Sequence, residues 1–259
     1  MEQQVVDSAS SFTSAVNLDQ LQMSSIPQRY VLPPLQRPNS SHLHISSTLP
    51  IIDLSTLSDQ SLISTTISDI RIASKEIGCF QVINHGIDQS VMDEALKVAT
   101  EFFNLPNEEK MRFFSEDVHK PVSNYLHGEI NGGWQTLAVN CYPACPQPGL
   151  TLGIHPHSDY GSITVLLQTR SGLEIKDKNN NWVPVPCIEG ALVVQLGDQM
   201  EVLSNGQYKS VIHRATVNGD EKRFSIVSLH SFAMDRKMGP ALELVDDHHP
   251  KSYNVKDVN

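Results

Sequence analysis

A change of pattern near residue 134 is the feature that most constrains the fold. Beyond it come short runs rich in β-branched and aromatic residues, separated by Gly, Asn, Asp or Pro. These runs cover residues 137–142, 162–168, 173–176, 182–185, 191–196, 211–217 and 224–230. Many short strands at this spacing predict a sandwich or barrel, because such a sheet has to bury one face against another. We therefore expect a mostly β fold in this half of the chain.

Helical patterns precede that point. Isoleucines recur with helical spacing from Ile63 to Ile77, and Gly78 then favours a helix end. A second apolar face runs from Val91 to Phe103, and Asn107 is the predicted N-cap of a third helix. Strands are expected at 49–54 and 79–83, and hairpin turns at 179–181 and 204–206. Helices followed by a β-rich block predict one architecture with the helices packed outside it.

The chain divides into three regions by composition. Residues 1–48 are expected to form a mobile N-terminal arm, because the first 25 are polar and rich in Ser. The prolines of residues 26–38 restrict their own backbone and that of their predecessors, so this part should be extended and poorly helical. Residues 49–133 form a helical and strand region, and 134–259 the main β domain.

Charge and cysteine content limit the class of protein. The formal net charge of −10 argues against nucleic acid or an anionic membrane as the main partner. Without a long apolar run or a signal-peptide pattern, we expect a cytoplasmic monomer that takes a small-molecule substrate. Cys141 and Cys145 could be half of a zinc site, but prolines interrupt them and no second pair follows. Free, reduced thiols are the preferred interpretation.

The candidate metal ligands flank Ser158. His157 and Asp159 lie on either side of it, and His213 follows in a later predicted strand. Two histidines and one carboxylate, with the other positions open, form the facial triad of non-haem Fe(II) oxygenases. A His-x-Asp pair is common by chance, however. The competing interpretation is a surface turn and an unrelated buried histidine.

Neighbouring polar residues favour the metal hypothesis. Arg223 and Ser225 share one face of a predicted strand, as Asn140 and Tyr142 do on another. A guanidinium and a hydroxyl together suit a carboxylate, since the planar fork donates two hydrogen bonds and the hydroxyl one more. The alternative for Arg223 is an exposed cation at a strand edge.

Several segments resemble one protein family in sequence and in order. They are residues 49–54, 80–86, 140–148, 157–162, 197–206, 213–215 and 223–225. The chain is similar to the plant soluble 2-oxoglutarate/Fe(II)-dependent dioxygenases, and residues 26–38 look closest to the flavanone 3-hydroxylase-like and downy-mildew-resistance (salicylate 5-hydroxylase-like) branch. The resemblance implies a double-stranded β-helix core, the cupin-like jelly roll, with N-terminal helices outside it.

The resemblance also implies roles for the polar residues. It assigns Fe(II) to His157, Asp159 and His213. It assigns 2-oxoglutarate to Arg223, Ser225, Tyr142 and Asn140. The expected activity is hydroxylation or desaturation of a small aromatic or flavonoid-type plant metabolite, with O2 as second cosubstrate and ascorbate in support. No catalytic side chain is expected beyond the iron centre.

The chain departs from the family pattern in two places. The segment between His85 and Asn140 is shortened, with the junction placed at Pro121–Asn124, and the sequence stops at Asn259 before the usual closing helix. An alternative function is therefore a truncated, catalytically impaired isoform that retains the metal-binding barrel. A zinc hydrolase with the same three ligands is disfavoured, because it leaves Arg223 and Ser225 unexplained.

Overall fold

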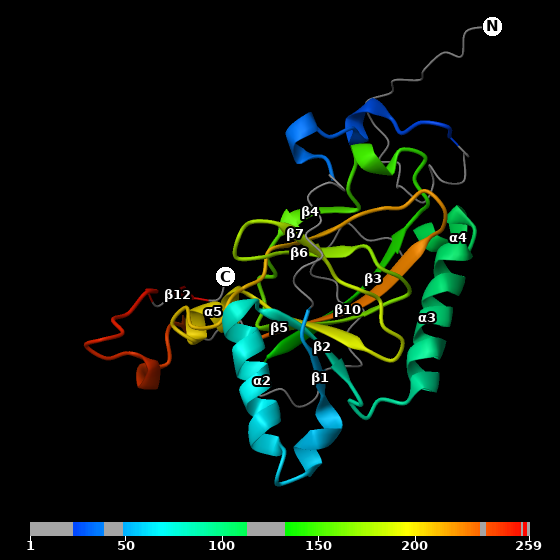
Figure 1. The fold of residues 1–259 in the computed structure, drawn as a ribbon. Coiled ribbons are helices and arrows are strands. Elements are labelled where there is room, and N and C mark those ends of the chain that lie inside the picture. The colour runs from blue at the N-terminus through cyan, green and yellow to red at the C-terminus, as the bar shows by residue number, and fades with distance from the viewer. Residues whose placement is uncertain (1–22, 39–48, 113–132, 234–236, 255, 258–259) are drawn as a thin grey trace, which may run out of the picture.

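A computed structural model describes residues 23–38, 49–112, 133–233, 237–254 and 256–257. Two sheets facing each other form its centre (Figure 1). The large sheet has the order β1-β2-β8-β5-β10-β3, and the small sheet has the order β4-β9-β6-β7. Only β1 and β2 pair in parallel among the described strands. This arrangement confirms the mostly β, jelly-roll expectation.

Most strands overlap the predicted runs, whereas the strands at 154–157, 237–238 and 256–257 were not predicted. The large sheet consists of β1 (Ile51–Asp53), β2 (Cys79–Ile83), β8 (Leu192–Leu196), β5 (Ile163–Gln168), β10 (Arg223–Ser231) and β3 (Trp134–Tyr142). The small sheet consists of β4 (Ile154–His157), β9 (His213–Ala215), β6 (Leu173–Lys176) and β7 (Trp182–Pro184). A separate pair joins β11 (Lys237–Met238) to β12 (Lys256–Asp257).

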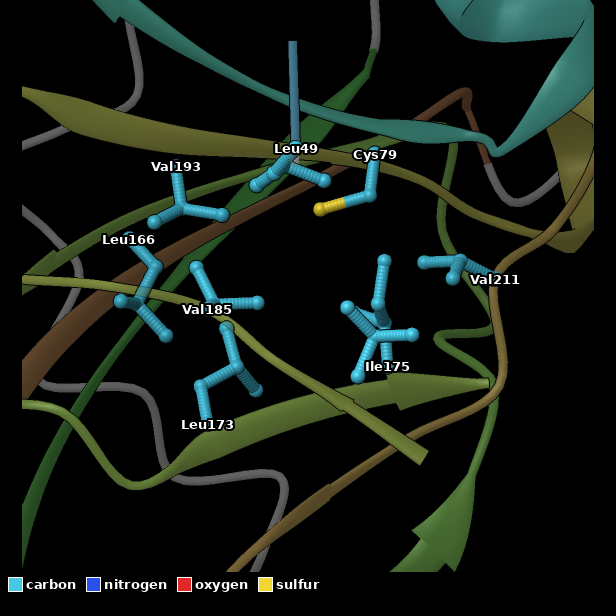
Figure 2. Packing of buried hydrophobic residues seen from close by; sticks show 9 residues of the cluster. Leu49, Cys79, Leu166, Leu173, Ile175, Val185, Val193 and Val211 are labelled. Atoms are coloured by element: carbon cyan, nitrogen blue, oxygen red, sulfur yellow. The ribbon is translucent and has the colours of Figure 1, made fainter. Parts of the chain in front are cut away.

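The main core lies between the two sheets. Successive side chains of a strand point to opposite faces, and along β5 every second residue is buried. Leu166 of β5 and Val193 of β8 meet residues such as Ile175 of β6 in one apolar cluster. Figure 2 shows these side chains directed toward one another in the space between the two sheets. The inward face of the large sheet is therefore the face that can carry a site inside the fold.

Helices cover the opposite face of the large sheet (Figure 1). Ala73 of α2 (Ile63–Glu76) and Met92 of α3 (Gln89–Asn104) pack with Phe80 and Val82 of β2 in a second apolar cluster. Gly78 ends α2 with a φ of 77°, and a Cβ there would lie 2.1 Å from the Lys209 carbonyl oxygen. No other residue satisfies both requirements.

The remaining helical elements are short. They are η1 (Gln28–Tyr30), η2 (Pro34–Gln36), η4 (Leu54–Ser58), α4 (Asn107–Met111), η5 (Pro148–Leu150), α5 (Asp198–Leu203) and η6 (Leu242–Leu244). Within the described ranges, no helix combines the length and apolar character that a membrane crossing requires.

Part of the predicted arm packs on the rest of the protein. The Leu32 amide donates to the Leu150 carbonyl over 2.9 Å, and the Ile26 amide donates to the Gln147 side chain over 3.0 Å. Residues 1–22 and 39–48 lie outside the described part of the chain, as does the Pro121–Asn124 junction.

Two local predictions were wrong. Asn107 is the first residue of α4, and its N-cap is Pro106, whose fixed φ ends one helix and starts the next. Residues 204–206 form no hairpin. They follow the C-terminus of α5, where Asn205 and Gly206 both have positive φ and the Gly206 amide donates to the Glu201 carbonyl. Residues able to adopt positive φ end helices as readily as they turn hairpins.

Candidate metal centre and cosubstrate site

Two histidines and an aspartate lie close together at one end of the β4–β9 strand pair. His157 is the last residue of β4 and pairs in register with His213, the first residue of β9. Asp159 lies two residues beyond the end of β4, in the loop that follows the strand. The ligand atoms of these three residues nevertheless all lie within 4.8 Å of one another. The structure thus brings all three predicted ligand residues together.

Backbone hydrogen bonds fix the orientation of both imidazoles. His157 Nδ1 lies 2.8 Å from the His155 carbonyl oxygen, and His213 Nδ1 lies 3.1 Å from the Val211 carbonyl oxygen. A carbonyl only accepts, so each Nδ1 carries the proton and each Nε2 keeps a free lone pair. These Nε2 atoms are 3.8 and 3.7 Å from Asp159 Oδ1. Such separations exceed a hydrogen bond and leave room for a cation among the three atoms.

The surroundings of His213 favour the neutral form of its imidazole. Burial lowers the pKa of its imidazole, and the neighbouring His157 acts in the same direction, while Asp159 opposes both. A neutral imidazole is the form that binds a metal ion. The set of two imidazole nitrogen donors and one carboxylate fits Fe(II), with further coordination positions left for other ligands.

Neighbouring residues hold the aspartate in place. Thr164, on the inward face of β5, donates its hydroxyl to Asp159 Oδ2 over 2.5 Å, which leaves Oδ1 directed at the histidines. The Asp198 amide donates to the Asp159 carbonyl over 2.8 Å. A Cβ at Gly197 would lie 2.6 Å from that carbonyl, so glycine permits the contact between the two loops.

Asp198 connects the two segments that carry the candidate ligands. Its Oδ1 accepts from the Ser210 hydroxyl over 2.6 Å, three residues before His213. Its Oδ2 accepts a longer bond of 3.4 Å from Ser158, between His157 and Asp159. The first residue of α5 therefore fixes both segments relative to each other.

A second group of polar residues lies on β10 and β3. Arg223 pairs in register with Tyr142, and Ser225 with Asn140, so all four predicted residues occupy neighbouring positions. The Arg223 guanidinium carbon lies 4.9 Å from the Tyr142 ring centroid, and Asn140 Nδ2 lies 3.3 Å from Ser225 Oγ. Arg223 is only 2% exposed, which contradicts the alternative of an exposed strand-edge cation.

The guanidinium of Arg223 is partly satisfied by the protein. Its Nε donates to the Arg170 carbonyl over 3.1 Å, and its Nη2 donates to Gln168 Oε1 over 2.9 Å. Nη1 is buried and has no acceptor among the described residues. A buried cation with an unpaired donor is costly, so the geometry calls for an anionic acceptor at this point. The distal carboxylate of 2-oxoglutarate fits this requirement.

Burial also defines the surroundings of this group. It raises the pKa of the Tyr142 phenol, although Arg223 and Ser225 act in the opposite direction, and the phenol stays protonated as a donor. Gly172, directly before β6, packs against the Arg223 side chain. Its φ is 150°, and a Cβ at this position would lie 2.8 Å from Arg223 Cδ. The arginine side chain is therefore packed against backbone.

Two cavities lie near the site without including its metal-centre residues. One, largely apolar and of about 450 Å³, lies beside β3 and is lined in part by Asn140 and Tyr142. The other, of about 600 Å³, is lined in part by His155, Trp182 and Arg214. Because neither lining includes a candidate metal ligand, neither cavity marks where a substrate would meet the metal.

Sequence reasoning missed several residues that support the site. Thr164 and Gln168 lie on the inward face of β5, and the alternation of residues 162–168 could have placed them there. No local signal indicated that Asp198 would connect the two ligand segments. Cys141 and Cys145 form no disulfide among the described residues. The described residues close enough together to share a metal ion are the His–Asp–His set alone.

Comparison with known proteins agrees with this geometry. Residues 133–231 match the family model of the 2OG-Fe(II) oxygenase superfamily, and residues 49–139 match the N-terminal model of non-haem dioxygenases in morphine synthesis. Flavanone 3-dioxygenase 3 of Oryza sativa subsp. japonica is 35% identical over 87% of this chain and 90% of its own length. The chloroplastic 2-oxoglutarate-dependent dioxygenase 21 of the same organism is 35% identical over 86% of this chain and 85% of its own.

A solved structure shares the fold. The crystal structure of JOX2 in complex with 2OG, Fe, and JA aligns with a TM-score of 0.80 at 27% identity, covering 96% of this chain and 92% of that one.

The alignment with flavanone 3-dioxygenase 3 extends over 296 positions, more than the 259 residues of the chain, so that relative has residues without a counterpart here. This length difference is consistent with the predicted shortening. The predicted junction at Pro121–Asn124 lies outside the described residues. The fold, the His–Asp–His set and the extent of these matches lead to one conclusion. The chain belongs to the 2-oxoglutarate- and Fe(II)-dependent oxygenase superfamily, among its plant dioxygenases.

Proposed function

We propose that this protein hydroxylates or desaturates a small aromatic or flavonoid-type plant metabolite, using Fe(II), 2-oxoglutarate and O2. His157, Asp159 and His213 are the proposed iron ligands. Support comes from the convergence of their ligand atoms within 4.8 Å and from the two imidazoles whose free Nε2 atoms face Asp159. Thr164 and Asp198 keep the three side chains in this arrangement.

Arg223, Ser225, Tyr142 and Asn140 are the proposed residues for 2-oxoglutarate. Arg223 Nη1 donates to the distal carboxylate, and Ser225 and Tyr142 supply hydroxyl donors beside it. Asn140 positions the Ser225 hydroxyl through its own side-chain amide. When bound together, Fe(II), 2-oxoglutarate and O2 supply the oxidising chemistry, in which 2-oxoglutarate is converted to succinate and CO2. The protein binds, orients and shields the reactants.

The buried, unpaired Nη1 of Arg223 is the observation that carries this proposal. A three-ligand centre alone is compatible with zinc and hydrolysis. A guanidinium that is 2% exposed and directed into the fold has no role in such a hydrolase, whereas it suits a dicarboxylic cosubstrate. Succinate formation that needs both Fe(II) and 2-oxoglutarate supports the oxygenase. Turnover with zinc and without 2-oxoglutarate contradicts it.

The substrate class rests on the relatives. A flavanone dioxygenase aligns over most of the chain, which supports a flavonoid-type substrate. The test is 2-oxoglutarate turnover of the purified chain against a panel that contains naringenin and salicylate, with product identified by mass spectrometry. Substrate-stimulated succinate release with an oxidised product is the expected result.

The second candidate function is a metal-binding isoform with impaired turnover. Two observations favour it. Leu137 and Val139, on the helix-facing side of β3, are 55% and 36% exposed, and the aligned relative contains residues that this chain lacks. Such exposed apolar surface lowers stability when a covering element is absent. Tight binding of Fe(II) and 2-oxoglutarate without any substrate-stimulated turnover across the panel would select this candidate.

A further inference from the structure

Two side chains that contact each other at the proposed cosubstrate position each have a buried, unpaired hydrogen-bond donor. Arg223 Nη1 and Gln168 Nε2 both lack an acceptor among the described residues. Gln168 is 7% exposed and Arg223 is 2% exposed. A buried donor without an acceptor is expensive, and the protein alone does not explain why two side chains that contact each other both have one.

The orientation of the Gln168 amide is fixed by its partner. Arginine has only donors, so the atom that lies 2.9 Å from Arg223 Nη2 must be the Gln168 carbonyl oxygen. The NH2 group of Gln168 therefore cannot point at the guanidinium. Both hydrogens of this NH2 group are available to an acceptor other than the protein atoms described.

The position of Gln168 in the sheet directs it toward the cosubstrate. It ends β5 and pairs in register with Ser225 of β10. Ser225 in turn pairs with Asn140, whose amide donates to the Ser225 hydroxyl. Gln168, Ser225 and Asn140 thus lie side by side on three adjacent strands, with Arg223 two residues before Ser225.

We propose that Gln168 is a further 2-oxoglutarate-binding residue, whose Nε2–H donates to the distal carboxylate beside Arg223 Nη1. This inference rests on the proposed function. One carboxylate has two oxygens with enough lone pairs for both orphaned donors and for the Ser225 hydroxyl. The Gln168 oxygen has a second task, because it holds the guanidinium plane through Nη2. Gln168 thereby links the cation to the anion it binds.

Three further buried glutamines each have one unpaired side-chain atom. Gln195 and Gln199 also have an unpaired Nε2, and Gln81 has an unpaired Oε1. Gln168 differs because its oxygen contacts the cosubstrate arginine directly. Gln81 is a suitable control: it is 1% exposed, lies on β2 of the same sheet, and donates to the Pro186 carbonyl instead.

The test compares two ligands in three variants. Anaerobic titrations measure the affinity of Fe(II)-loaded protein for 2-oxoglutarate and for 2-oxopentanoate, which has the same carbon chain without the distal carboxylate. Gln168→Met is expected to weaken 2-oxoglutarate binding roughly 10- to 100-fold, the range for a hydrogen bond to a charged group. Gln168→Glu keeps the oxygen toward Arg223 but places a carboxylate against a carboxylate, so its loss should be larger. Gln81→Met should match wild type for both ligands.

Binding of 2-oxopentanoate decides between a binding role and a structural one. It should stay within about 2-fold of wild type in both Gln168 variants, because a lost hydrogen bond matters only where the acceptor exists. Equal losses for both ligands, or unchanged 2-oxoglutarate affinity in Gln168→Glu, overturn the inference. Gln168→Glu is nearly isosteric and serves if Gln168→Met does not fold. Failure of wild type to bind 2-oxoglutarate would instead overturn the proposed function.

Discussion

The candidate metal centre and the cosubstrate group are built in different ways. The proposed metal ligands come from the ends of two short strands and from a loop, and the His157 side chain is 40% exposed. The cosubstrate group lies on β3 and β10, nine residues each and paired along their whole length, where Arg223 and Ser225 are 2% and 1% exposed. The metal centre lies at strand ends and has one exposed histidine, whereas the cosubstrate group lies within the large sheet and is buried.

This difference indicates that the two regions have separate roles. The anchoring end of the site is preorganised by regular strand pairing, so few extra contacts are needed there. The metal end has to stay accessible to substrate and O2, so its geometry depends on side-chain contacts from Thr164 and Asp198. Substitutions in the two regions should therefore affect different ligands.

The largest effect is expected from Arg223→Met. Removing a buried cation that binds an anion should cost about 2–5 kcal/mol of 2-oxoglutarate affinity. Fe(II) affinity measured without 2-oxoglutarate should remain near wild type, because the arginine does not contact the metal centre. Lys178→Met, which removes an exposed cation, is the control. A parallel loss of Fe(II) affinity in Arg223→Met would show that the two regions are not separable.

Asp198→Ala should affect the metal end. It removes the carboxylate that holds Ser210 and Ser158, and loss of an outer partner of a metal site typically costs 10- to 100-fold in metal affinity. Titration of Fe(II) under anaerobic conditions measures this, with Asp59→Ala, an exposed turn residue, as the matched control. Wild-type metal affinity in Asp198→Ala would mean that the ligand segments hold their positions without it.

Thr164→Val should give a smaller change of the same kind. Valine keeps the size of the side chain but cannot donate to Asp159 Oδ2, so metal affinity should fall about 10-fold. Thr164→Ser restores the hydroxyl and should recover most of the loss. If serine and valine behave alike, packing and not the hydrogen bond explains the effect.

The smallest effect is expected on the helix-facing side of β3. Leu137→Thr and Val139→Thr replace exposed apolar side chains by a β-branched polar one, and the free energy of unfolding should change by no more than about 0.5 kcal/mol. Binding of a hydrophobic dye should fall, and affinities for both ligands should stay constant. A large loss of stability would indicate that these side chains are packed in solution.

Sequence patterns predicted the positions of strands better than they predicted the contacts between segments. Residues 173–176 and 79–83 were predicted with the bounds that the structure shows, because β-branched runs between turn residues depend on local preferences. Asn205 and Gly206 were misassigned, since a positive φ suits a helix end and a hairpin equally. Only the fold reveals that Asp198 contacts Ser210, or that Arg223 and Gln168 contact each other and each keep an unpaired donor.

Anaerobic titration of 2-oxoglutarate with and without Fe(II) tests most directly whether the two regions form one active site. In wild type, Fe(II) should tighten 2-oxoglutarate binding, and 2-oxoglutarate should tighten Fe(II) binding by the same factor, because coupling between two ligands is reciprocal. Asp159→Asn should abolish that gain and leave the metal-independent affinity intact. An affinity for 2-oxoglutarate that is the same with and without Fe(II) in wild type would contradict the account.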